Sequence, residues 1–344
     1  MRTNSTAAWP RAFALAAMVS CASAMSAFGA AGDNGQYFMI EGLYLEKDDV
    51  GTVALTAAGN ALNPYNPVSS DIIELLDGTG GLRGTLQFES YGNFWQASAF
   101  GVVPFDEHAF VSDLDFGGVG GDNTSTTYAV FDEVGVPDGD DPENSEFLHA
   151  LDLDLEANLW GAAFDWLHPI GKIDFLFGLR FIHYGEELRF VAFDSAAALA
   201  GGIGDRIAIN VDNDMLGLQA GFQGMWNIWS IVAIGGNIKG GLAVNFVDRS
   251  RSFSADNGDL VIPDFTDNRD GTGFAQFVEV NPRIDIVLGQ SATLTMAGTA
   301  LWINQTSRAL SHFETATDVT DANLRDDDDE LFYGASIGAR LALD

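Results

Sequence analysis

Charged side chains recur at every second position in several segments of the chain, and apolar residues flank them. Five of these side chains are basic and seven are acidic. On facing walls they could set up a transverse field across a water-filled constriction, or they could pair into a network that closes the space. The candidate lumen-lining residues are Arg83, Glu89, Asp152, Asp154, Glu156, Asp174, Arg180, Lys239, Glu279, Arg283, Asp285 and Arg340.

Few residue patterns point to catalysis. The segment Gly334-Ala335-Ser336-Ile337-Gly338 has the spacing of a nucleophile elbow, but no histidine follows it and no helix is predicted after it. None of the five histidines has the spacing of a metal ligand. We therefore predict no enzyme activity, no catalytic or metal-ligating residues and no cofactor.

The elements that position the charged residues are predicted to be β-strands, because apolar residues recur with a period of two. In the last of these segments Leu331, Ile337 and Leu341 share one face, opposite Arg340. The segments 82–89, 150–159, 173–181 and 274–288 show the same division. We expect the apolar faces, including the leucines of 150–159, to point outward and the charged faces to point inward.

Short and long connectors alternate strictly between these segments, which is typical of an outer-membrane barrel and not of a soluble sandwich. The short connectors are 90–93, 168–171, 227–228 and 289–291, and the long polar ones are 47–80, 104–146, 191–205, 249–271 and 305–329. We predict an all-β fold, a transmembrane antiparallel up-and-down β-barrel with short periplasmic turns and long acidic external loops. Ten strands are expected, at 36–46, 81–90, 94–103, 148–166, 172–190, 206–226, 229–247, 272–288, 292–304 and 330–343. Twelve is the alternative, with Gly51–Ala58 as part of a further hairpin.

Residues 1–31 are predicted to be a secretory signal peptide, because Arg2 and Arg11 precede a short apolar stretch that small residues follow. Residues 32–344 then form the barrel domain. The single cysteine, Cys21, lies within the signal peptide. An alternative interpretation of the loose lipoprotein box that ends there is that Cys21 becomes a lipidated N-terminus.

The chain has 16 Lys and Arg residues against 49 Asp and Glu residues, a net charge of −33. This balance excludes a nucleic-acid binder, because neutralising phosphates requires an excess of basic residues. Residues 104–146 alone hold twelve acidic residues and no Lys or Arg. Solvation of an external loop is the simpler interpretation. The alternative is that such acidic loops hold Ca²⁺ or Mg²⁺ and bridge to anionic surface lipid.

Several short motifs are spread over nearly the whole chain after the signal peptide: Tyr37–Leu45, Gly81–Leu86, Gly178–Phe181 with Glu186, Asn213–Gly221, Glu279–Asn281 and Ala297–Trp302. These motifs resemble the β-barrel porin family of pore-forming outer-membrane proteins. The resemblance implies a pore in the bacterial outer membrane. The chain departs from many outer-membrane barrels at its end, where Asp344 stands in place of a terminal aromatic residue.

Together these patterns predict a porin-like barrel that lets small solutes or ions diffuse passively, with a modest preference for cations concentrated at an acidic mouth. The alternative is a closed structural or adhesive barrel with cation-binding acidic loops, and a third is a secreted soluble β-protein. The expected partners are outer-membrane lipid, lipopolysaccharide and the barrel-insertion machinery. The sequence does not decide between a monomer and a homo-oligomer.

Overall fold

The computed structural model describes residues 35–47, 78–112, 150–193, 196–202, 204–254, 265–309 and 328–343. Its strands are β1 (Tyr37–Lys47), β2 (Thr79–Ser90), β3 (Asn93–Val102), β4 (Phe105–Ser112), β5 (Ala150–Ile170), β6 (Ile173–Phe193), β7 (Asp205–Asn227), β8 (Val232–Ser254), β9 (Phe265–Val287), β10 (Ala292–Thr306) and β11 (Asp328–Ala342), and the short helix α3 (Ala196–Gly201) follows β6. Among these residues, no helix is long and apolar enough to span a membrane. The predicted signal peptide, the candidate hairpin Gly51–Ala58 and most of the stretch 104–146 lie outside the described residues.

Antiparallel pairing joins the strands into one closed ring. The order is β3-β2-β1-β11-β10-β9-β8-β7-β6-β5-β4, and β3 also pairs with β5. Both β3 and β4 pair with β5, through Gly101↔Trp160 and Phe105↔Ala157, so they act as one long strand interrupted at 103–104. The described strands therefore form a ten-stranded up-and-down barrel, which confirms the predicted fold class.

The short connectors lie at one rim, as the sequence predicted. Between β2 and β3, Tyr91 and Gly92 both have positive φ values, 54° and 74°, the geometry of a two-residue hairpin turn whose twist matches that of the strands. The other short turns follow β5, β7 and β9. Because the chain crosses the barrel once per member of the ring, the strand ends that lead into the longer connectors lie at the opposite rim. Residues 103–104, between β3 and β4, stay within the wall.

Two predicted loops are partly strand, and these expectations were wrong in extent. The stretch 104–146 begins with β4, because Pro104 interrupts the ladder for only two residues before pairing with β5 resumes. The stretch 249–271 is largely the end of β8 and the start of β9, which pair from Val232↔Ile286 to Phe253↔Phe265. Polar residues there resemble a loop in sequence, but cross-strand pairs such as Arg251↔Asp267 keep them in the ladder.

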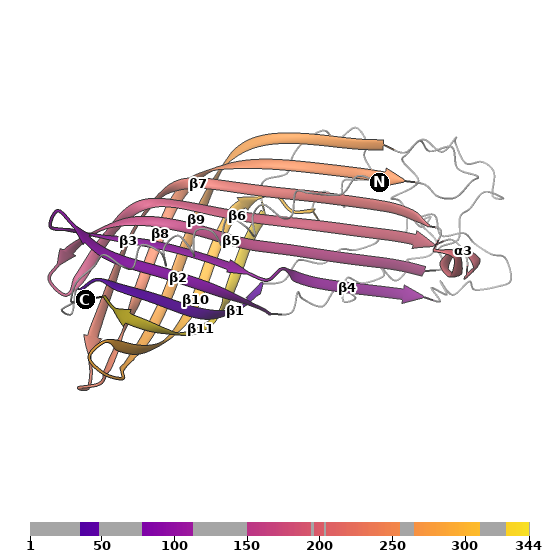
Figure 1. Ribbon diagram of the computed structural model, residues 1–344. Coiled ribbons are helices and arrows are strands. Elements are labelled where there is room, and N and C mark those ends of the chain that lie inside the picture. The colour runs from indigo at the N-terminus through magenta and orange to yellow at the C-terminus, as the bar shows by residue number, and fades with distance from the viewer. Residues whose placement is uncertain are drawn as a thin grey trace, which may run out of the picture.

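Strand length divides the barrel into two parts. The strands β5 to β9 have 21 to 23 residues, whereas β1 has 11 and β2 has 12. A tilted strand needs about 9–11 residues to cross a bilayer. The long strands therefore project well beyond a membrane-thick ring, and Figure 1 shows β4 to β7 running on past the ends of β1 and β2. We call this extension the projecting wall, formed by β4 and the far ends of β5 to β9.

The outer surface near the short-turn rim is apolar. Large side chains such as Leu218, Ile238 and Val280 point away from the barrel and are 38% to 54% exposed. Their inward neighbours alternate with them, because successive residues of a strand face opposite sides. A continuous apolar belt of this kind is the surface that a transmembrane barrel presents to hydrocarbon.

The interior is apolar towards the projecting wall and polar towards the short turns. The cluster of buried apolar side chains towards the projecting wall includes Leu155, Leu188, Ile209 and Phe332, each fully buried. In β5 this reverses the prediction for 150–159, because the leucines point inward and the acidic residues between them point outward. The reason is that this part of β5 lies beyond the apolar belt, where the outside is water and the inside is the core.

Candidate functional site: the charged interior of the barrel

Most of the predicted lumen residues lie on inward faces. Near the short-turn half, the structure brings together seven of them: Arg83, Arg180, Lys239, Glu279, Arg283, Asp285 and Arg340. Asp174 also points inward, close to the rim, where its carboxylate accepts a hydrogen bond of 3.1 Å from Gln223. Glu89 is exposed one residue from the β2–β3 turn.

Three of the predicted lumen residues lie elsewhere, and this corrects the expectation. Asp152, Asp154 and Glu156 stand on the outward face of β5, opposite buried Leu153 and Leu155. The side chain of Asp154 is 51% exposed. Leucine and acid alternate in the same way whether the leucines face lipid within the membrane or the core of the barrel beyond it. The pattern alone therefore does not tell which of the two faces points into the barrel.

Glu279 of β9 is the first centre of the interior network. One of its carboxylate oxygens lies 2.8 Å from the Arg180 guanidinium of β6, and the other lies 4.0 Å from that of Arg83 of β2. The side-chain amide of Asn281 donates a further hydrogen bond of 2.7 Å to Glu279. Neither β6 nor β2 neighbours β9 in the sheet, so these contacts cross the lumen.

Asp165 of β5 is the second centre, and it is completely buried. Its two carboxylate oxygens are occupied separately, one by the Lys239 ammonium at 3.0 Å and the other by the Gln219 amide at 2.6 Å. Lys239 belongs to β8, which does not neighbour β5. This buried pair is satisfied by hydrogen bonds on both sides, which is the condition for a buried charge to be tolerated.

A third group lies nearer the short-turn rim, around Asp285. Arg283 and Arg340 approach its carboxylate at 3.3 Å and 3.4 Å, and the Thr295 hydroxyl donates a hydrogen bond to it at 2.9 Å. On the neighbouring part of the same wall, the hydroxyl of Ser336 on β11 donates a hydrogen bond of 2.8 Å to buried Glu41 of β1.

Sequence reasoning missed Asp165, Glu41 and Gln219. Asp165 lies between Phe164 and Trp166 in an aromatic segment that has no run of charged residues to mark a polar face. A signal was present, because Asp165 shares its face with Leu155 and Leu159 at even spacing. A single charge on an otherwise apolar face would have marked the change from apolar to polar interior along β5.

Little room is left among these side chains. The cavity lined by Glu41, Arg83, Arg180, Lys239 and Glu279 has a volume of about 50 Å³. A water molecule needs roughly 10–15 Å³ of such volume, so the cavity holds a few waters. It is too small for an organic solute.

A second charged cluster lies further from the short turns, around Tyr184, whose ring packs against buried Phe332. Lys47 of β1 makes ion pairs with Glu186 of β6 at 2.6 Å and with Glu330 of β11 at 3.1 Å. Arg308 approaches Glu330 at 2.9 Å, and the Tyr184 hydroxyl donates a hydrogen bond to Glu186. Lys47 and Glu186 come from nearly opposite walls, so the interior is bridged side to side at this level as well.

The backbone after β10 also enters the interior. From Gln305, which has a positive φ of 56°, the chain turns inward, and Thr306, Ser307 and Ala309 are completely buried. Ser307 exchanges two hydrogen bonds of 2.8 Å and 2.9 Å with the side chain of Asn213 on β7. We call residues 305–309 the inward segment.

The projecting wall carries a small cluster of its own on the outside. The ring nitrogen Nδ1 of His108 lies 2.7 Å from Asp154 and 3.4 Å from Asp152. The hydrogen bond to Asp154 raises the pKa of His108 above its ordinary value, although partial desolvation opposes the rise. The ligand atoms of these three residues lie within 4.8 Å of one another, close enough for a metal ion. The prediction from sequence, that no histidine has metal-ligand spacing, did not foresee this arrangement, because His108 and the two aspartates meet only across strands.

Comparisons with known proteins find likeness in structure only. Neither a protein-family model nor a curated protein matches the chain, so the resemblance to the β-barrel porin family stays a prediction. The outer membrane protease OmpT of Escherichia coli superposes with a TM-score of 0.38 and 10% identity, over 92% of this chain and 99% of that one. The toluene transporter TodX of Pseudomonas putida gives 0.31 and 8%, over 91% of both chains. TbuX, a toluene transporter of Ralstonia pickettii, gives 0.31 and 11%, over 90% of both.

Proposed function

We propose that the protein is a closed outer-membrane β-barrel with a structural role, which reaches that membrane by way of the predicted signal peptide. The observation that carries the proposal is the pair of bridges between distant walls, Arg180 with Glu279 and Lys47 with Glu186. Charges that pair across the lumen at two levels, together with a buried apolar cluster that includes Phe332 and Leu155, favour closure over a transverse field in open water. This is the alternative that the sequence left open beside passive diffusion.

The structural role we infer is to hold the projecting wall at the cell surface. Its outward face presents carboxylates to solvent, among them Asp154, Glu156, Asp212, Asp214 and Asp248. Such a face attracts cations, and divalent cations would link it to the phosphates of lipopolysaccharide or to neighbouring surface molecules. Passive diffusion with a modest cation preference is the competing proposal, supported by the many charges in the lumen.

Planar-bilayer recording distinguishes the two proposals. The closed barrel predicts no discrete conductance steps from protein whose folding has been verified by heat-modifiable mobility on gels. A porin of known conductance, inserted into the same bilayer, is the control for detection. Steps whose reversal potential favours K⁺ over Cl⁻ would overturn closure and support diffusion.

A further inference from the structure

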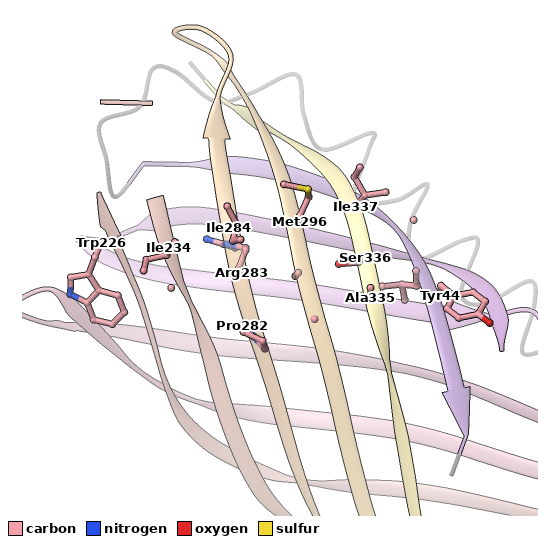
Figure 2. A pocket seen from close by; sticks show the side chains of 15 residues that line it. Tyr44, Trp226, Ile234, Pro282, Arg283, Ile284, Met296, Ala335, Ser336 and Ile337 are labelled. Atoms are coloured by element: carbon pink, nitrogen blue, oxygen red, sulfur yellow. The ribbon is translucent and has the colours of Figure 1, made fainter. Parts of the chain in front are cut away.

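The outer wall of the barrel is hollowed on the side formed by β7 to β11 and β1. This depression, which we call the wall hollow, has a volume of about 990 Å³. Its sides include Tyr44, Trp226, Ile234, Met296 and Ile337, and Figure 2 shows Trp226 and Tyr44 at its two ends. All five point outward, into the apolar belt, on the half of the barrel nearer the short turns.

The floor of the hollow is a part of the wall where strand pairing is interrupted and where glycines provide no side chains on the outer face. Pro282 of β9 has no N–H to give to the ladder, and pairing of β9 with β10 stops after Ala297↔Arg283 and resumes at Ala300↔Val280. Gly298 faces the break, and a β-carbon there would lie 3.2 Å from the Pro282 ring. With Gly42 also on the floor, large side chains surround a patch that has none.

The break is held together from the inside, so the hollow is a fixed shape. The Thr299 hydroxyl donates a hydrogen bond of 3.0 Å to the Asn281 side chain, across the unpaired positions. Arg83 donates to both residues from β2, at 3.2 Å and 3.3 Å. These polar groups lie on the lumen side of the floor, whereas the side chains around the hollow on the outer side are mainly aliphatic and aromatic.

The chemistry of the surroundings selects the occupant. The lining offers water few hydrogen-bonding partners, and a site needs such partners to hold ordered water. The wall of a second barrel is rigid and cannot follow the outline of a hollow of this size, whereas a flexible hydrocarbon chain can. Because the hollow continues the lipid-facing belt and lies towards the short, periplasmic turns, the leaflet beside it is phospholipid.

We propose that the wall hollow binds one acyl chain of a membrane phospholipid, as a specific site distinct from the loosely held lipid around the barrel. Tyr44 and Trp226 bound the chain at either end, and Gly42 and Gly298 leave room for it along the floor. The proposal rests on the proposed outer-membrane location but not on closure of the lumen, so a conducting barrel would leave it standing.

Native mass spectrometry of the folded, delipidated barrel in detergent, titrated with dioleoyl phosphatidylethanolamine, tests the site. We expect the first lipid to bind at least tenfold more tightly than later ones. In Gly42→Leu the new side chain fills the hollow, because a β-carbon at Gly42 meets nothing nearer than 3.8 Å, and the first binding should weaken at least tenfold. Gly84→Leu is the matched control, since a β-carbon there has no neighbour within 4 Å and the residue does not line the hollow.

Three results would overturn the proposal. One is equal binding of the first lipid to the native protein and to Gly42→Leu, with both folded by gel mobility. Another is equal binding of glycerophosphoethanolamine, which has the headgroup but no chains. The last is a dimer that Gly42→Leu dissociates, which would assign the hollow to a second copy. If Gly42→Leu fails to fold, Ile337→Trp narrows the same hollow from its side and carries the same expectation.

Discussion

At the scale of single residues, the interior depends on charges that have several partners each. Asp165 is buried completely, yet Lys239 and Gln219 occupy both of its carboxylate oxygens. Removing one partner of such a buried pair typically costs about 3–5 kcal/mol, because the remaining charge keeps its desolvation cost and loses its compensation. Replacing both partners by apolar residues removes that cost as well.

Lys239→Met should therefore destabilise the barrel by about 3–5 kcal/mol. The double variant Lys239→Met with Asp165→Leu should be markedly more stable than the single variant. Guanidinium unfolding in lipid vesicles, with both variants at the same pH, measures the difference. A double variant as unstable as Lys239→Met alone would show that the pair contributes packing instead of charge compensation.

The pKa of His108 provides a second residue-scale prediction, outside the membrane. Its folded-state pKa is raised above 6.5, chiefly by the hydrogen bond to Asp154. The protonated form is thus favoured by folding, so the small stability contribution is fully present below about pH 6.5 and is lost as the pH rises through the raised pKa. An NMR titration of the imidazole should show this raised pKa, and Asp154→Asn should lower it. Asp174→Asn, at the far rim, is the control that should leave it unchanged.

The residues of the site were only partly predictable from sequence. Arg180 and Glu279 alternate with outward apolar neighbours inside the membrane belt, so their inward orientation follows from the period of two. Asp152 and Asp154 also alternate with apolar residues, but they point outward. Beyond the apolar belt the outer face meets water and the inner face meets the apolar core. Which residues pair across the lumen depends on ring position and stagger, which no local pattern encodes.

At the scale of elements, the inward segment is the least expected part of the described chain. Sequence placed 305–329 in a polar loop, yet the amide of Ala309 donates a hydrogen bond of 2.8 Å to Glu186, on the far wall. The Asn213 side chain pairs with both backbone groups of Ser307, much as a neighbouring strand would. This pairing depends on one asparagine side chain at the level of Ser307 in the barrel, and neither the composition nor a repeating pattern in the sequence indicates such a position.

Asn213→Ala should loosen the inward segment without opening the barrel wall. Losing a buried hydrogen-bonding group costs about 1–3 kcal/mol, and 1.4 kcal/mol corresponds to a factor of ten. We expect hydrogen exchange of the Ser307 amide to become at least tenfold faster. Asn237→Ala, which removes a bond to Asn281 nearer the short turns, should leave that amide unaffected. Unchanged exchange in Asn213→Ala would mean that other contacts hold the segment.

The strands themselves were largely predictable, because ten alternating segments correspond to the ten members of the ring. Their ends beyond the belt were not. There the inside of β8 carries Arg249 and Arg251 instead of apolar residues, and a strand that buries arginines resembles a loop in sequence. The strand predicted at 94–103 likewise stops before β4, which resumes the pairing with β5 after Pro104.

At the scale of the whole molecule, charge is distributed very unevenly. The interior clusters hold seven basic groups: Lys47, Arg83, Arg180, Lys239, Arg283, Arg308 and Arg340. They hold six acidic ones: Glu41, Asp165, Glu186, Glu279, Asp285 and Glu330. The difference, 7 − 6, is +1, against −33 for the chain. The excess acid therefore lies outside these clusters.

The pairing of β1 with β11 also bears on how the barrel assembles. It joins residues as far apart in sequence as Tyr37 and Ala342, and contacts of such separation are the slowest to form. Until they form, both strands are open edges, which invite pairing with other chains. A slip of β1 by one residue would turn Glu41 towards lipid and away from Ser336 of β11. The buried pair of Glu41 and Ser336 therefore disfavours closure of the ring in a register that is wrong by one residue.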